Sequence, residues 1–384
     1  LRIVWASEVR KKDKKYDLEK RTVNIQLAHK IELNPTNVQR GYFARACGTA
    51  RFVWNRGLAE WNRQYEEGLK PSGPALKKAF NAIKKEEFPW VSDVLRDANS
   101  QPFSNLQTAF GNFFKGRAKR PHFKKKGIGD SFYIANDKFR IDENRIRIPK
   151  LGWVRMKEPF CQFGKIMNAT VSRTADRWFV SIGVRMNITP ATCENQAVVG
   201  VDLGVRHLAT LSDGEIIEGP GAYRKSEKKL RRFQQSFARK QKGSKNRERQ
   251  KRKISRLHYR ISCMRQDALH KLTTKLVRKF STIVIEDLNV RGMLRNGRLA
   301  KTISDMGFYE FRRQLEYKAR ISGVRVIIAD RWFPSSKRCS ACGEKHPNLT
   351  LSDRTFVCPA CSLRIDRDLN AARNLEMYPG LMVA

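Results

Sequence analysis

Apolar residues recur at two different spacings, and the spacing changes near residue 115. Between residues 36 and 115 they repeat every three or four positions, which predicts helices. A long helix is expected from an N-cap at Thr36 to about Tyr65, and a second begins at Pro74. Further helical segments are expected over 91–96 and 103–114. The aromatic stripe of the long helix is expected to be a core face, with base stacking as the alternative.

Alternating apolar and polar residues on either side of this helical block predict short strands. The early strand is expected to pair with the later ones in an antiparallel sheet or small barrel, so that the helices are an insertion. The predicted strands are 22–33, 131–141, 145–148, 153–156, 166–173 and 178–184.

The second half of the chain combines buried strands with helices. A continuous apolar run over 197–201 predicts a central strand, and two shorter strands are expected at 207–212 and 215–218. Two long basic helices, a strand at 282–286, a helix at about 303–320 and a strand at 324–329 follow. A short helix begins near Asp366. This order of elements is that of an RNase H-like α/β domain.

Three acidic residues lie at the ends of these elements. Asp202 and Glu286 end apolar strands, and Asp368 begins the last helix. An RNase H-like fold places such residues at one sheet edge. We therefore expect them to bind two Mg²⁺ (or Mn²⁺) ions for two-metal-ion hydrolysis of phosphodiesters. Asp287 and Asp366 are the local competitors and are expected to have supporting roles. A helix cap or an ion pair remains the alternative for each acid taken alone.

The hairpin that contains Asp202 has a second interpretation. Gly200-Val-Asp-Leu-Gly204 is also similar to a phosphate-binding strand of actin-like ATPases and sugar kinases. Those proteins need a second glycine-rich phosphate hairpin and an adenosine loop, which the sequence lacks. They would also have no use for the strongly basic charge of this chain.

The eight cysteines fall into two groups. Four occur singly and are expected to be small buried apolar residues: Cys47, Cys161, Cys193 and Cys263. The others form two Cys-x-x-Cys pairs with fifteen residues between them: Cys339, Cys342, Cys358 and Cys361. This spacing predicts a structural zinc ribbon, with an iron site or an empty site as the alternative. The pattern suits a reducing cytoplasm.

Charge decides the class of partner. The chain has 78 Lys and Arg against 37 Asp and Glu, a net charge of +41. This favours nucleic acid over an anionic membrane surface. No apolar run approaches the ~20 residues of a membrane span, and no secretory segment is visible. The most basic tract, 224–260, has seventeen Lys and Arg against two Glu. The residues expected to bind nucleic acid are Lys115, Arg117, Lys119, Arg120, Lys124, Lys125, Lys126, Lys228, Lys229, Arg231, Arg232, Lys251, Arg252, Lys253 and Arg256.

Together these motifs resemble the TnpB family, the transposon-encoded RNA-guided DNA nucleases related to compact type V CRISPR effectors. The resemblance covers about residues 22–376 and departs at Ser362, where the family usually has glycine, and in a short tail after Leu375. The matching C-terminal motifs are Gly200-Val-Asp-Leu-Gly-Val205, Ile283-Val-Ile-Glu-Asp-Leu-Asn289, Asp330-Arg-Trp-Phe-Pro-Ser-Ser-Lys337 and Asp366-Arg-Asp-Leu-Asn-Ala-Ala-Arg-Asn374. The upstream motifs are Phe52-Val-Trp-Asn55, Asn112-Phe-Phe-Lys-Gly116, Pro121-His-Phe-Lys-Lys-Lys126 and Val171-Ser-Arg-Thr-Ala-Asp176.

The resemblance implies a domain organisation, and the predicted elements set its boundaries. A basic, flexible leader is expected first. A wedge-type β-barrel then carries a helical recognition insertion, and a RuvC-like nuclease domain is interrupted by the zinc ribbon. The boundaries are 1–20 for the leader, 21–35 and 116–190 for the barrel, 36–115 for the insertion, 191–333 and 363–384 for the nuclease, and 334–362 for the ribbon.

The resemblance also implies an activity. The chain is expected to be a metal-dependent endodeoxyribonuclease that binds a transposon-derived guide RNA. It would cut double-stranded DNA beside a short target-adjacent motif. A monomeric ribonucleoprotein is expected rather than a dimer, in a prokaryotic cytoplasm and on the nucleoid when bound to DNA. A catalytically silent RNA-guided repressor and an RNA-independent DNA-strand transferase are the alternatives.

Overall fold

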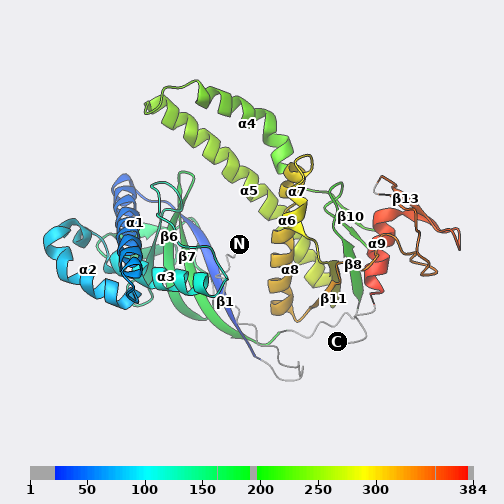
Figure 1. Cartoon of the computed structure of the whole chain (residues 1–384), viewed down its shortest axis with the longest axis horizontal. Coiled ribbons are helices and arrows are strands. Elements are labelled where there is room, and N and C mark those ends of the chain that lie inside the picture. Colours follow the sequence, from blue (N-terminus) through cyan, green and yellow to red (C-terminus); the bar gives the residue numbers. More distant parts are fainter. Residues whose placement is uncertain (1–21, 162, 191–196, 351, 379–384) are drawn as a thin grey trace. The chain divides into compact units, whose positions relative to one another are not determined.

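The computed structural model describes residues 22–378 except 162, 191–196 and 351. The predicted leader and Cys193 lie outside these described residues. The chain divides into two compact units, one containing Val23–Ile188 and the other beginning at Thr189. Figure 1 labels the helices and strands of both units.

The first unit is built on two antiparallel sheets. The larger has the strand order β1-β7-β6-β2, and the smaller is the meander β3-β4-β5. The early strand does pair with the later ones, since Val23 lies opposite Ile188 and Leu33 opposite Trp178. A bridge between Leu33 and Met156 joins the two sheets, and closure into a barrel stays a prediction. The strands are β1 (Val23–Leu33), β2 (Ser131–Ala135), β3 (Arg140–Asp142), β4 (Arg145–Ile148), β5 (Gly152–Arg155), β6 (Lys165–Thr174) and β7 (Arg177–Ile188).

The segment 131–141 was predicted as one strand and is two. β2 ends at Ala135 and pairs with β6, whereas β3 begins at Arg140 and pairs with β4. A turn between them carries the chain from one sheet to the other. Alternation of apolar residues continues through such a turn, so the pattern alone does not reveal the change of sheet.

The helices between β1 and β2 follow the predicted pattern with two corrections. The segment expected to be helical over 91–96 is a 3₁₀ helix that ends at Asp93, and the next two residues are extended. Thr36 caps the first helix through a capping box with Gln39. The expected break between 96 and 103 is absent, because one helix runs through Pro102. Buried contacts of Phe103 and Leu106 on that helix offset the hydrogen bond that Pro102 removes. The helices are α1 (Asn37–Glu66), α2 (Gly73–Glu87), the 3₁₀ helix Pro89–Asp93, and α3 (Arg96–Phe114).

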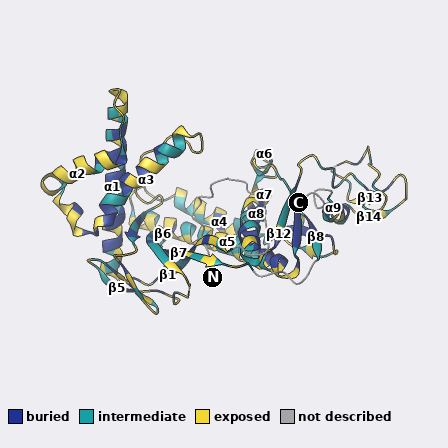
Figure 2. Ribbon diagram, turned by 90° about the horizontal axis from the view of Figure 1, so that it is seen from below, coloured by how far each residue is buried: buried dark blue, intermediate teal, exposed yellow. Residues whose placement is uncertain are grey.

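The aromatic stripe of α1 is a core face, as predicted. The Phe43 ring lies 5.0 Å from the Trp178 ring of β7, and the Trp61 ring stacks on Phe110 of α3 at 4.3 Å. Figure 2 shows α1 buried along much of its length and α2 mostly exposed. Helix α1 therefore contributes many of the hydrophobic contacts that join the helices to the sheet, together with the start of α3.

The second unit has a five-stranded mixed sheet of order β10-β9-β8-β11-β12. β8 is parallel to β11, and β11 to β12, whereas β9 is antiparallel to both of its neighbours, β8 and β10. This is the strand order of an RNase H-like fold, as the element pattern predicted. The second and third strands are shorter than predicted. The strands are β8 (Val198–Asp202), β9 (Ala209–Leu211), β10 (Ile216–Ile217), β11 (Thr282–Glu286) and β12 (Arg325–Ala329).

Helices cover both faces of this sheet. Helices α5 and α8 pack on Val199, Val201, Ile283 and Ile285, while α9 packs on the face that carries Val284. The helix predicted over 303–320 is two helices, because Gly307 adopts a left-handed conformation (φ 74°) between them. The helices are α4 (Ala222–Ala238), α5 (Lys245–Lys279), α6 (Val290–Met293), α7 (Ala300–Met306), α8 (Phe308–Ser322) and α9 (Arg367–Glu376).

Contact between α9 and β8 depends on a residue without a side chain. A Cβ atom at Gly200 would overlap the Ala372 carbonyl oxygen and lie 2.5 Å from the Glu376 amide nitrogen. The glycine therefore lets the helix backbone touch the strand backbone. In Figure 1, α9 lies along β8.

None of the described helices is long and apolar enough to cross a membrane.

Replacing Gly200 with Ala should push α9 away from β8. Overpacking of this kind costs about 1–3 kcal/mol of unfolding free energy, to be measured by denaturant unfolding. Gly297→Ala is the matched control, because no atom lies within 4 Å of a Cβ built there. Equal stability of the two variants would contradict the close packing.

Candidate nuclease site and zinc ribbon

Strand alternation brings the first two acids to the same face of the sheet. Side chains at even positions of β8 and β11 face α9, since Val198 and Val284 pack with Leu375. Asp202 and Glu286 are both at even positions. The residues directly before them, Val201 and Ile285, are paired in the parallel ladder. The two acids therefore end neighbouring parallel strands on the face covered by α9.

The third acid, Asp368, lies in the first turn of α9. All three acids are half-buried. Burial raises the pKa of Asp202 well above its ordinary value, and the carboxylates of Glu286 and Asp368 raise it further, against the opposing Arg367. The structure thus places the three predicted acids close enough to interact electrostatically.

The acids are less tightly gathered than the cysteines. Among the described residues, the four ribbon cysteines are the only group of three or more possible ligands whose ligand atoms lie within 4.8 Å of one another. Three carboxylates at one sheet edge repel each other, as the raised pKa of Asp202 shows. Hard divalent cations prefer such oxygen ligands and would remove this repulsion. The donor set therefore fits Mg²⁺ or Mn²⁺.

Glu286 has a partner that sequence reasoning missed. The hydroxyl group of buried Ser335 donates a hydrogen bond to Glu286 Oε1. The Ser335 carbonyl oxygen accepts one from Asn374 Nδ2 of α9 at 2.7 Å. Ser335 thus connects the strand that carries Glu286 with the helix that carries Asp368.

Two buried asparagines of α9 hold the start of the ribbon. Asn370 and Asn374 both donate to the Arg338 carbonyl oxygen, at 2.7 and 2.6 Å, and Asn370 Oδ1 accepts from the Ser340 amide at 3.0 Å. Two asparagines four residues apart on an otherwise apolar helix face could have indicated this contact from the sequence. They join α9 directly to the ribbon backbone.

The two competing acids, Asp287 and Asp366, each have structural partners. Asp287 accepts hydrogen bonds from Arg312 at 2.8 Å and Arg331 at 2.5 Å, and Arg312 contributes most to lowering its pKa. Asp366 caps α9 by accepting from the amides of Asp368 and Leu369, at 2.9 and 3.1 Å.

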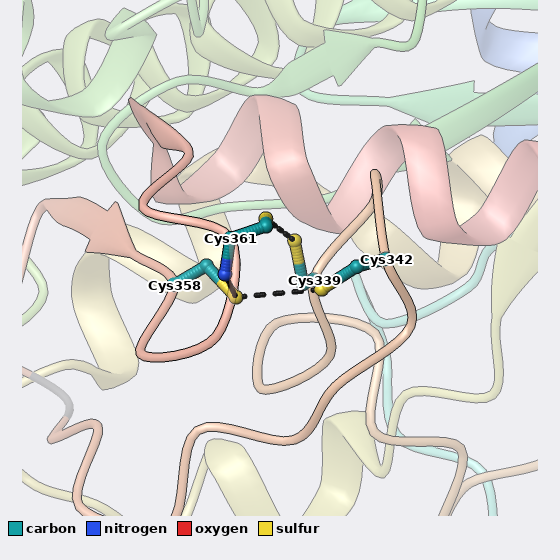
Figure 3. A group of neighbouring side chains, drawn as sticks. All are labelled: Cys339, Cys342, Cys358 and Cys361. Carbon is teal, nitrogen blue, oxygen red and sulfur yellow. Dashed lines mark hydrogen bonds between the residues drawn. The ribbon is translucent and has the colours of Figure 1, made fainter.

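The four cysteines converge from two loops (Figure 3). The Cys339 and Cys361 sulfur atoms are 3.6 Å apart, and those of Cys342 and Cys358 are 3.5 Å apart. Tetrahedral coordination with Zn–S bonds of about 2.3 Å requires sulfur atoms about 3.8 Å apart. The amide of Cys361 donates to Cys358 Sγ and is the main reason why the pKa of Cys358 is lowered to about 6. The cluster therefore fits a zinc ion in a closed structural site.

The turn at Ser362 has the backbone geometry that a glycine would have. This serine has a left-handed backbone (φ 59°), the conformation that glycine adopts without strain. The turn after the second cysteine pair therefore keeps its glycine-type geometry. The antiparallel strands β13 (Thr355–Val357) and β14 (Arg364–Asp366) follow the first cysteine pair and lead directly into α9.

The single cysteines behave differently from one another. Cys47 is buried, which raises its thiol pKa to about 12. Cys263 is half-buried, but Cys161 is exposed, which contradicts the expectation of burial.

The predicted nucleic-acid-binding residues form one set in each unit. All fifteen are exposed. Those at 115–126 lie in the loop after α3. Trp54 of α1 holds this loop, because its Nε1 donates a hydrogen bond to the His122 carbonyl oxygen at 3.0 Å. Lys124 is partly engaged, because its ammonium group lies 4.2 Å above the Trp54 ring. The residues at 228–232 and 251–256 lie on α4 and α5.

Helices α4 and α5 form a hairpin with a narrow apolar seam that includes Leu230, Leu257 and Ile261. Sequence reasoning missed its anchor, the buried Asp305 of α7. Asp305 accepts from the amide of Tyr223 at the start of α4 at 3.0 Å and from Arg265 of α5 at 2.8 Å. One carboxylate thus fixes the base of the basic hairpin.

Comparison with known proteins identifies the family of this chain. Residues 180–297 match the family model OrfB of IS605, described as "Probable transposase". Residues 308–375 match "Cas12f1-like, TNB domain" and 24–70 match "Helix-turn-helix domain". Several relatives are named "Putative RNA-guided DNA endonuclease", and two of them match over most of their length. The one from Streptomyces pristinaespiralis is 40% identical (91% of this chain, 89% of the relative), and InsQ of Escherichia coli K12 is 37% identical (91% of each). The chain belongs to the TnpB family.

Solved structures agree on the fold. A Cas12f1 chain in a complex with its sgRNA and target DNA matches with a TM-score of 0.57 at 14% identity, covering 87% of this chain and 82% of that chain. The helix-turn-helix match covers residues that form β1 and α1 in this structure. The chain therefore shares the fold of this Cas12f1 chain, and the match of residues 308–375 to the Cas12f1-like domain relates its sequence to type V effectors.

Zinc should copurify with the protein at about one ion per chain. Replacing Cys358 with Ser should remove it and lower the melting temperature, because the ribbon is bonded to α9 through Asn370 and Asn374. Elemental analysis and thermal unfolding measure both effects. Cys161→Ser is the control, since that thiol is exposed and lies outside the cluster. A wild-type protein free of zinc and other metals would contradict the ribbon site.

Asp202→Asn should stabilise the metal-free protein. A raised carboxyl pKa means that the charged form is disfavoured in the folded state, so at neutral pH the charge lowers stability. Each kcal/mol recovered corresponds to about 2–4 °C in melting temperature. Mg²⁺ should stabilise the wild type, whereas the variant should respond weakly. Asp267→Asn, at an exposed position on α5, is the control. A metal-free Asp202→Asn protein that melts below the wild type would contradict this electrostatic description.

Proposed function

We propose that this protein is an RNA-guided DNA endonuclease with one metal-dependent site at Asp202, Glu286 and Asp368. The observation that carries the proposal is the convergence of these three acids from β8, β11 and α9 on one face of an RNase H-like sheet. The match covers 89% and 91% of the length of two relatives, and the names of these relatives support the same activity.

The residues have distinct roles in this proposal. Asp202, Glu286 and Asp368 bind Mg²⁺ (or Mn²⁺), Ser335 orients the Glu286 carboxylate, and the asparagines of α9 hold Asp368 in register with the ribbon. Bound divalent ions supply Lewis-acid stabilisation of the attacking and leaving oxygens. The sulfur cluster binds Zn²⁺ as a structural site.

Guide RNA and double-stranded DNA are the proposed partners of the basic surfaces. Base pairing with the guide would select the target, and the protein would bind backbones and a short target-adjacent motif. The exposed cations of α4, α5 and the loop after α3 have few acidic neighbours and suit phosphate contacts. A monomeric ribonucleoprotein is proposed as the functional unit. A discrete RNA that copurifies with the protein would distinguish this function from an RNA-independent strand transferase.

Replacing Asp202, Glu286 or Asp368 with Ala should abolish cleavage of matched DNA and leave guided DNA binding intact. The reason is that these acids bind metal and make no favourable contact with phosphate. Cleavage in Mg²⁺ and a gel-shift titration measure the two properties. Asp267→Ala is the control for a surface acid. A variant that still cuts near the wild-type rate would exclude that acid from the site, and a wild-type complex that binds without cutting would favour the silent repressor.

Neutralising Lys251, Arg252 and Lys253 together should weaken guided binding equally for two unrelated guides. Removing one interaction with a phosphate should flatten the log–log dependence of affinity on salt by about 0.7–0.9. A salt titration of the triple alanine variant measures the slope. An unchanged slope would mean that these side chains do not bind phosphate, and weaker binding with only one of the guides would mean that the protein reads sequence there.

A further inference from the structure

The turn between β12 and the ribbon holds an exposed tryptophan on a fixed backbone. The Trp332 amide donates to Asp330 Oδ1 at 2.8 Å, and the Phe333 amide donates to the Asp330 carbonyl oxygen at 3.0 Å. The Asp330 amide donates to the Tyr378 hydroxyl at 3.2 Å, and the Phe333 ring meets the Tyr378 ring edge-on at 5.0 Å. The turn is therefore held by its own hydrogen bonds and by the residue that follows α9.

Trp332 itself is 84% exposed. One exposed apolar side chain is ordinary on a protein surface. The place of Trp332 is what distinguishes it, because it lies three residues before Ser335, whose hydroxyl contacts Glu286. Three residues of extended chain span at most about 11 Å. The indole is thus carried by a rigid turn near the proposed metal-binding acids.

A cation with a fixed orientation precedes the indole in the chain. Arg331 Nη2 donates to Asp287 Oδ2 at 2.5 Å and Arg331 Nε donates to the Asp287 carbonyl oxygen at 3.3 Å. Asp287 directly follows Glu286, so the guanidinium is held beside the end of β11. The Arg331 side chain remains 48% exposed. It therefore keeps surface available for a phosphate while its position is set by Asp287.

We propose that Trp332 and Arg331 form a binding subsite for one unpaired nucleotide of the DNA strand that is cut. The base stacks on the indole and a neighbouring phosphate contacts the guanidinium. Stacking of this kind tolerates any base sequence, as a nuclease guided by RNA requires. A base inside a duplex is already stacked on its neighbours, so the subsite selects a separated strand. This inference rests on the proposed nuclease function and adds the feature that positions the strand at the acids.

The first test is cleavage by the complete ribonucleoprotein on matched double-stranded DNA. Trp332→Ala should slow cleavage about ten- to a hundredfold, and Trp332→Phe should restore most of the rate, because phenylalanine keeps an aromatic face. Tyr309→Ala is the matched control, since Tyr309 is 72% exposed on α8 of the same unit. It should cut at the wild-type rate. The zinc content and melting temperature of Trp332→Ala should equal those of the wild type.

The second test asks which strand the indole contacts. 2-Aminopurine is placed at successive positions of either DNA strand in complexes of the Asp202→Ala protein, and its fluorescence reports stacking. Quenching that disappears with Trp332→Ala should occur within a few nucleotides of the cut. An abasic site at that position should slow the wild type and have no further effect on Trp332→Ala.

Three outcomes would overturn the subsite. The first is a Trp332→Ala variant that cuts at the wild-type rate. The second is a substitution that slows cleavage of intact and abasic substrates equally. The third is quenching confined to 2-aminopurine placed in the guide RNA. A wild-type ribonucleoprotein that binds matched DNA and leaves it intact contradicts the proposed nuclease instead. In that case, quenching by Trp332 in the unpaired DNA still decides whether the subsite binds a base.

Discussion

The backbone contact between α9 and β8 is the constraint on which the C-terminal unit depends. It exists because Gly200 has no Cβ atom, which lets Ala372 and Glu376 of the helix touch the strand. Asp202 lies two residues beyond this glycine and Asp368 one turn before Ala372. The same contact that closes the core therefore sets the separation of two of the three acids.

The zinc ribbon and the acid cluster are joined through hydrogen bonds of this helix. Asn370 and Asn374 bind carbonyl oxygens at the start of the ribbon, and Ser335 in the same segment binds Glu286. A zinc ion that closes the ribbon would stabilise the position of α9 as well as its own loops. The cysteine cluster and the three acids are thus connected by three buried polar side chains.

The basic residues of the C-terminal unit fall into two groups. Most Lys and Arg of α4 and α5 are exposed and surround only a narrow apolar seam. A few basic residues have fixed partners, such as Arg265 with Asp305 at the base of the hairpin and Arg331 with Asp287 beside Glu286. The first kind suits diffuse binding to backbones, and the second sets the geometry of the hairpin and of the proposed nucleotide subsite.

The sequence by itself determined the elements and the chemical groups. Periods of two and 3.6 residues, together with continuous apolar runs, predicted most strands and helices, because burial requires such patterns. The short elements α6, β13 and β14 were not predicted. The two Cys-x-x-Cys pairs and the acids after apolar strands identified the candidate ligands. The pattern misplaced two element boundaries. Helix α3 continues through Pro102, where tertiary contacts compensate a local cost, and the left-handed backbone of Gly307 divides α7 from α8.

Only the tertiary structure decided how distant residues meet. The contacts of Ser335 with Glu286 and of Asp305 with α4 join positions 49 and 82 residues apart. The close approach at Gly200 likewise depends on a helix more than 150 residues later in the chain. Such contacts depend on the distance between elements after packing, which no local pattern of polar and apolar residues records.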